Sequence, residues 1–166
     1  LNAGLYLAFT LALMKVLPTE DYGEYGYLYG LAGIVPFFLN LGVNKSFITF
    51  PWTEKDGEVF NNYLGLYWKT KLTLISCLIL FSIGFYFYYD NILEVGALLC
   101  GILFGFSESF KAPAESKRNF NFVSKIVPIR NILLFTFFAI TYLFSVLDLK
   151  LIILILLVSN LLNIIF

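Results

Sequence analysis

Long apolar stretches alternate with short polar connections along the whole chain of 166 residues. A helix needs about 20 mostly apolar residues, each rising about 1.5 Å, to cross the hydrocarbon core of a bilayer. Six stretches reach or approach this length, at residues 1–14, 25–44, 72–89, 92–110, 131–147 and 151–166. The pattern predicts an all-α, polytopic membrane helix bundle with six transmembrane helices, of which the first and the last are truncated.

Basic residues are confined almost entirely to two of the connections. Nine of the eleven Lys and Arg residues fall there, the exceptions being Lys15 and Lys150. They are Lys45, Lys55, Lys69 and Lys71 in the second connection, and Lys111, Lys117, Arg118, Lys125 and Arg130 in the fourth. Basic connections stay in the cytoplasm when a chain crosses a membrane repeatedly. This distribution predicts that both termini are cytoplasmic and that the short acidic connections lie outside.

The composition favours a membrane protein over a soluble one. The chain is 60% hydrophobic and 13% charged, whereas a soluble domain is about a quarter charged. A formal net charge of zero gives no reason to expect a nucleic-acid partner. Cys77 and Cys100 both lie in apolar stretches, so we expect them to be small buried side chains and not a disulfide or a metal pair.

Small and polar residues within the apolar stretches predict how the helices pack. Gly101 and Gly105 form a GxxxG pair, and Gly30 and Gly33 precede Pro36. These glycines favour close helix packing, with a hinge as the alternative. In the last span, Asn160, Asn163 and nearby Ser159 favour interhelical hydrogen bonding over substrate contact. Residues 57–71 repeat apolar positions at helical spacing and predict a short interfacial helix leading into the third span.

No catalytic constellation is visible in the sequence. It contains no histidine and no GxSxG, HExxH or P-loop motif, so we expect no catalytic residue, no metal and no cofactor, and we do not expect an enzyme. Glu108 and Lys111 are three residues apart at the inner end of the fourth span. They are interpreted as a local ion pair or as part of a cytoplasmic gate.

Basic residues at the inner ends of the spans are the candidates for binding a substrate. The topology signal and contact with anionic lipid heads account for most of them. Lys45, Arg118 and Arg130 are the ones we assign to a phosphate-bearing lipid substrate. An Arg side chain suits phosphate because its planar fork donates two hydrogen bonds at once.

Three residue runs resemble bacterial polysaccharide flippases. The run MKVLPTEDYGEY at 14–25 resembles their first outer loop, roughly Arg-x-Leu-x-x-x-x-Tyr-Gly-x-Tyr, with matches at Leu17, Pro18, Asp21, Tyr22, Gly23 and Tyr25 and with Lys15 in place of Arg. The run NLGVNKSFI at 40–48 is similar to their Asp/Asn-Leu-Gly pattern at the inner end of the second span, and ESKRNFNF at 115–122 is a third similarity. Their order along the chain resembles the multidrug/oligosaccharidyl-lipid/polysaccharide exporter superfamily.

The resemblance implies that residues 1–166 form a single transmembrane domain, the N-terminal six-helix lobe of a longer transporter with two such lobes. It implies a multi-pass protein of the bacterial plasma (inner) membrane that flips lipid-pyrophosphate-linked oligosaccharide by alternating access, for surface polysaccharide such as O-antigen. The implied partners are membrane lipids, this substrate and the missing C-terminal lobe of the same chain. Lys45 is the basic residue that we carry over as a contact at the mouth of the cavity.

Two other functions stay open on the sequence. A drug or cation antiporter of the same fold needs an acidic residue within a span, and Glu108 is the nearest candidate. A membrane-embedded polysaccharide polymerase or acyltransferase needs a large outer loop or an intramembrane set of His, Arg and Asp. The sequence shows neither of these features, which places the enzyme behind the two transporters.

Overall fold

The computed structural model describes residues 2–49, 57–116, 131–140, 142 and 148–165. Its helices are α1 (Asn2–Val16), α2 (Thr19–Asn40), α3 (Val43–Thr49), α4 (Gly57–Tyr89), α5 (Ile92–Ser109), α6 (Lys111–Ser116), an unlabelled helix at Asn131–Ile140, and α8 (Leu149–Ile165). These ranges contain no β-strand. The prediction of an all-α fold is therefore confirmed for the described part of the chain.

Two helical stretches are long and apolar enough to cross a membrane, namely α4 and the stretch Ile92–Ser116 that contains α5. The bent pair Thr19–Asn40 and Val43–Thr49 adds a third if the pair is counted as one span. The other apolar helices are shorter in their described parts, at Leu7–Val16, Asn131–Ile140 and Leu149–Leu162. The described residues thus provide two or three helices suited to a membrane, and the count of six spans stays a prediction.

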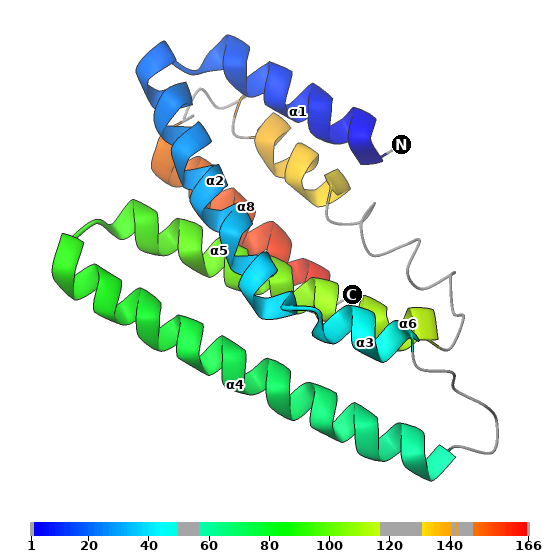
Figure 1. The fold of residues 1–166 in the computed structure, drawn as a ribbon. Helices are drawn as coiled ribbons and strands as arrows, with labels where there is room; N and C mark the ends of the chain where they lie inside the picture. Colours follow the sequence, from blue (N-terminus) through cyan, green and yellow to red (C-terminus); the bar gives the residue numbers. More distant parts are fainter. Residues whose placement is uncertain (1, 50–56, 117–130, 141, 143–147, 166) are drawn as a thin grey trace.

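The bundle is organised around three helices. Figure 1 shows α2, α5 and α8 crossing in the middle, with α4 along one side and α1 along the other. The helix Asn131–Ile140 lies beside α1, where the rings of Phe9 and Phe138 meet edge to face with centroids 5.3 Å apart. Leu13, Leu28 and Ile152 are almost completely buried in the same apolar cluster. This cluster joins the first, second and last helices into one core.

The contact between α2 and α5 is made by the GxxxG pair. A Cβ atom on Gly101 would collide with the carbonyl oxygen of Ala32 and would lie 2.8 Å from Val35 Cβ. A Cβ atom on Gly105 would lie 2.6 Å from Leu39 Cδ1. Both residue numbers increase together across the contact, so the two helices run parallel and their C-termini lie at the same end of the bundle. The close packing predicted for this glycine pair is confirmed.

The second glycine pair, Gly30 and Gly33 on α2, makes no such close contact. A Cβ atom on Gly30 or Gly33 would meet nothing within 4 Å among the described residues. These positions therefore do not bring two described helices together, and the expectation of close packing is wrong for them there. Gly33 instead lines a small pocket described below.

Local backbone conformation and capping explain where α2 and α4 end and where α5 begins. Leu41 and Gly42 have φ angles of 29° and 77°, in the left-handed region where a helix stops. The axis of α3 is bent by 46° from that of α2. At the end of α4, Asp90 has a φ of 50°, and the next residue, Asn91, caps α5 by accepting a hydrogen bond from the amide of Leu93 at 3.0 Å.

One helix, α4, departs from two expectations. Residues 57–71 are helical as predicted, but they continue into the third span without a break, so no separate interfacial helix precedes it. In the most apolar segment of α4 only 6% of the residues are buried, whereas 44% are buried in the corresponding segment of Ile92–Ser116. Cys77 on α4 is exposed whereas Cys100 on α5 is buried. The prediction of a buried cysteine is confirmed for Cys100 and wrong for Cys77.

We expect Gly101→Ala to destabilise the fold, because the added methyl group must push apart two helix backbones. Overpacking of this kind costs about 1–3 kcal/mol. Gly84→Ala is the matched control, since its Cβ atom would meet nothing within 4 Å among the described residues, and alanine is the better helix former by about 0.5–1 kcal/mol. Thermal unfolding of the purified proteins in detergent measures both. Equal midpoints for the two variants would contradict the assigned contact.

Candidate functional site

The most polar part of the described interior lies where α2 and α5 end. Lys71, on α4, has no exposed surface. Its ammonium group donates to the carbonyl oxygen of Leu39 at 2.7 Å and to Asn40 Oδ1 at 2.9 Å. It also lies 5.5 Å from the centre of the Tyr67 ring, within the range of a cation–π contact. Lys71 therefore closes the C-terminus of α2 from a neighbouring helix.

Tyr67 lies one helical turn before Lys71 on α4 and closes the C-terminus of α5. Its hydroxyl group lies 2.6 Å from the carbonyl oxygen of Ser109 and 2.9 Å from Asn44 Oδ1. A tyrosine hydroxyl has a single proton to donate, so these two acceptors share it. Asn44 in turn donates from Nδ2 to Asn40 Oδ1 at 2.9 Å, across the bend between α2 and α3. The side chains of Asn40, Asn44, Tyr67 and Lys71 thus form one hydrogen-bonded group, which we call the polar cluster.

The polar cluster supplies hydrogen-bond donors to carbonyl groups at the C-termini of α2 and α5. The last carbonyl groups of a helix have no partner within that helix, and such groups are costly to leave unbonded away from water. The C-terminus of a helix also carries partial negative charge, which a nearby cation stabilises. Lys71 supplies that cation to α2, and no carboxylate pairs with it in the part of the chain that is described. Its positive charge is therefore balanced by carbonyl and amide dipoles.

An apolar group of side chains packs against one side of the polar cluster, at Tyr67. It is formed by α3, the first half of α4 and α6, through the side chains of Phe47, Phe60, Tyr67 and Ala112, with Val43, Leu64 and Trp68 partly buried against them. The rings of Phe47 and Tyr67 lie 4.9 Å apart. The hydrogen bond from Tyr67 to Ser109 is buried, and shielding from water strengthens such a bond.

The five residues proposed from the sequence lie at this end of the bundle or outside the described residues. Lys45 is exposed on α3, one residue after Asn44 of the polar cluster. Glu108 and Lys111 form an ion pair between α5 and α6, with 27% and 16% of their side chains exposed. The predicted local ion pair is confirmed, whereas a role in a gate stays a prediction. Arg118 and Arg130 lie outside the described residues.

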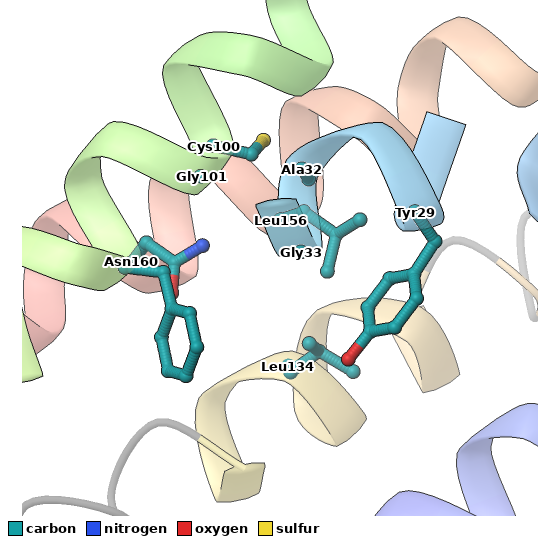
Figure 2. A pocket seen from close by; sticks show the side chains of 9 residues that line it. Tyr29, Ala32, Gly33, Cys100, Gly101, Leu134, Leu156 and Asn160 are labelled. Atoms are coloured by element: carbon teal, nitrogen blue, oxygen red, sulfur yellow. The ribbon is translucent and has the colours of Figure 1, made fainter. Parts of the chain in front are cut away.

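A small, partly open pocket lies between α2, α5, α8 and the helix Asn131–Ile140. Figure 2 shows the ring of Tyr29 and the amide group of Asn160 on opposite sides of it, with Leu134 and Leu156 between. The pocket has a volume of about 70 Å³. Its lining is mostly apolar, and no charged residue is part of it. It can hold a small neutral group but offers no site for a charged phosphate.

Two polar atoms of α8 have no hydrogen-bond partner among the described residues. They are Ser159 Oγ and Asn160 Oδ1, and both side chains are buried. The interhelical hydrogen bonds expected from these two groups are therefore not made there. The side chain of Asn163, the third residue of that prediction, lies outside the described side chains.

Sequence reasoning missed the polar cluster. Lys71 was counted among loop residues because it directly precedes an uncharged stretch. One signal was present, namely the run Asn40–Leu41–Gly42, which marks a helix end whose carbonyl groups need donors. Which residue supplies the donor depends on how α4 lies against α2, and no local pattern carries that information. In the described residues, no group of three or more Cys, Asp or Glu side chains is placed to hold a metal ion.

We expect Lys71→Met to destabilise the fold. Methionine fills a similar volume, but the carbonyl oxygen of Leu39 then loses its partner, and an unpaired buried acceptor costs about 1–3 kcal/mol. Lys150→Met, at an exposed position of α8, removes the same charge from the surface and is the control. Thermal unfolding in detergent compares the two variants. A Lys71→Met protein as stable as the control would show that the ammonium group is not needed to close α2.

We expect Asn160→Leu to raise the midpoint of thermal unfolding, by an amount equivalent to about 1 kcal/mol, because it removes a buried acceptor that has no partner. Leu156→Met is the control, since it changes the same pocket without changing its polarity. If the Asn160 amide serves a transported group, the same variant should lower transport while it raises stability. A lower midpoint for Asn160→Leu would mean that this amide is bonded in the folded protein.

Comparison with known proteins identifies no relative. No family model matches the chain, and neither a curated protein nor a solved structure matches it. The function is therefore inferred from the residues and contacts described above.

Proposed function

We propose that this chain is a membrane-embedded lobe of a transporter that flips lipid-linked oligosaccharide across the bacterial plasma membrane for surface polysaccharide synthesis. The proposal includes six spans, both termini in the cytoplasm, and alternating access against a second lobe. It assigns no covalent chemistry to the chain. A polar head group must cross the hydrocarbon inside a protein-lined cavity, and this requires a path and a moving element but no catalytic side chain.

One observation carries the proposal: the two longer runs that resemble flippases lie at the two ends of α2. The run at 14–25 spans the turn from α1 into α2, and the run at 40–48 spans the bend from α2 into α3. Asn40 and Asn44 of the second run belong to the polar cluster. The resembling residues are therefore concentrated where helices begin, end and bend, which supports the resemblance as more than shared composition.

The exposed apolar surface supports a membrane location. Phe87 and Tyr88 near the end of α4 are each 81% exposed, and Leu80 in its middle is 68% exposed. Leu80 and Phe87 are seven residues apart and share one face of the helix, and Tyr88 lies about 100° round from Phe87. Such large exposed apolar side chains favour lipid or another protein surface as the surroundings. These aromatic residues lie at the C-terminal end of α4, as expected for a membrane interface.

The proposed substrate contact is Lys45. It is exposed on α3, beyond the bend, at the end of the bundle that carries the basic connections. In the proposed orientation this end faces the cytoplasm, where the lipid-linked oligosaccharide is made and where its pyrophosphate must be recognised. Arg118 and Arg130 are proposed as further phosphate contacts, and Glu108 with Lys111 as a gate, on sequence grounds alone.

Deletion of the gene tests the proposal. We expect loss of surface polysaccharide, accumulation of lipid-linked oligosaccharide on the cytoplasmic side, and rescue by the complete gene. Gel analysis of surface polysaccharide and mass spectrometry of the extracted lipids measure the two effects. Normal polysaccharide together with new drug sensitivity would instead favour the antiporter.

In the complemented strain, Lys45→Ala should lower polysaccharide export at an unchanged protein level, because it removes a cation from the cytoplasmic mouth. Lys150→Ala removes an exposed cation from the start of α8, at an outer connection in the proposed topology, and should leave export unchanged. Equal export by the two variants would remove Lys45 from the proposed site and leave the transport function itself intact.

A further inference from the structure

Asn160 on α8 holds a buried hydrogen-bond acceptor that no described residue uses. Its side chain is only 7% exposed, and its Oδ1 atom has no partner among the described residues. The side chain lines the small pocket between α2, α5, α8 and the helix Asn131–Ile140 (Figure 2). A buried acceptor is costly to leave unbonded. A group that enters the pocket can supply the missing donor.

The lining of the pocket restricts the chemistry of that group. No charged side chain takes part, so an ionised group would lose its hydration without compensation. Tyr29 and Phe104 contribute aromatic rings, whereas Ala32 and Gly33 are too small to fill the space. A sugar ring combines C–H groups, which pack on aromatic rings, with hydroxyl groups, which donate hydrogen bonds. Apolar walls with one unpaired acceptor therefore suit a neutral sugar.

The pocket opens to the surface beside α2. Tyr29 is 42% exposed and Gly33 is also exposed, whereas Cys100, Leu134 and Asn160 on the other walls are buried. The volume of about 70 Å³ exceeds the roughly 10–15 Å³ that one water molecule needs, but it is too small for a whole sugar ring. One hydroxyl or hydroxymethyl group can therefore enter while the ring stays at the mouth, against Tyr29.

The pocket lies at a depth where a polar head group needs such a partner. Asn160 is about 16 Å along α8 from Leu149, the first residue of that helix. This distance is close to half of the hydrocarbon thickness of about 30 Å. A sugar that crosses the membrane gives up bound water at this depth, and an unpaired acceptor on the protein can replace one of the lost hydrogen bonds.

We propose that this pocket receives one hydroxyl group of a neutral sugar in the transported oligosaccharide, and that the hydroxyl group donates its proton to Asn160 Oδ1. The inference rests on the proposed function for the identity of the transported molecule. It adds a contact for the sugar to the phosphate contact proposed at Lys45. The two contacts differ in depth, because Lys45 lies at the cytoplasmic mouth and Asn160 near the middle of the membrane.

The test is saturation-transfer difference NMR on protein purified from expression of the complete gene, with glucose and N-acetylglucosamine as probes. The detergent is lauryldimethylamine oxide, which has no sugar head group. We expect the wild-type protein to transfer saturation to the ring protons of at least one of the two sugars. Asn160→Leu should weaken the affinity about tenfold, because the bound hydroxyl group loses its acceptor. No transfer from the wild-type protein would overturn the proposal, as would equal affinity for the variant.

Two glycines of α2 provide a matched pair of variants. Gly33 lines the pocket and Gly26 does not, although a Cβ atom on either would meet nothing within 4 Å among the described residues. Gly33→Leu should fill the mouth of the pocket and abolish the transfer, whereas Gly26→Leu should keep it. Similar transfer from both variants would overturn the assignment of the sugar to this pocket.

Deoxy analogues of the sugar that binds identify the hydroxyl group. One analogue should bind the wild-type protein more weakly than the parent sugar, and Asn160→Leu should not weaken its binding further, because both changes remove the same hydrogen bond. If Asn160→Leu weakens the binding of every analogue to the same extent as that of the parent sugar, the hydroxyl group does not donate to Asn160 and the proposal is wrong.

Export in the complemented deletion strain separates this inference from the proposed function. Asn160→Leu should lower polysaccharide export at an unchanged protein level, whereas Leu154→Met, at a position of α8 that is 53% exposed and outside the pocket, should not. Normal export by Asn160→Leu would overturn the sugar contact and leave the flippase intact. Normal polysaccharide after gene deletion would contradict the flippase, and the NMR measurements would still decide whether the pocket binds a sugar.

Discussion

The backbones of α2 and α5 touch at Gly101 and Gly105 without a side chain between them, and the rest of the described structure depends on this contact. Because the two helices run parallel, their C-termini lie at the same end of the bundle, about one turn apart. Their last carbonyl groups therefore need donors in the same small region. Tyr67 and Lys71, one turn apart on α4, supply both. A larger residue at either glycine would push the two helices apart.

This arrangement combines rigidity with a built-in bend. The chain leaves α2 through two residues with left-handed backbone conformations, and a single shared acceptor, Asn40 Oδ1, then links α3 and α4 to the end of α2. The Tyr67 hydroxyl group lies within hydrogen-bond distance of acceptors on both α3 and α5. In the proposed transporter such a junction would couple the end of one span to its neighbours. The proposed substrate contact, Lys45, follows directly after it.

Much of the element pattern followed from the sequence, because apolar length and charged connections are local properties. The GxxxG pair was identified for the same reason, since four-residue spacing places both glycines on one helix face. The same logic was wrong for Gly30 and Gly33, which meet no described helix. It was also wrong for Cys77, because an apolar neighbourhood in the sequence does not distinguish a core from a lipid-facing surface. Ser159 and Asn160 likewise required knowledge of which helix lies opposite.

By itself, the sequence determined the helical class, the positions of most helix ends and the segregation of basic residues to two connections. These properties arise from backbone hydrogen bonding in an apolar medium and from the local preferences of Gly, Pro, Asp and Asn. Only the tertiary structure decided that Lys71 is a buried cap and not a loop charge. It alone placed the polar cluster and the small pocket beside Tyr29 and Asn160, because each joins residues from three or four helices. The physical reason is that the donor for a buried carbonyl group comes from another helix, so the packing of the helices decides which residue supplies it.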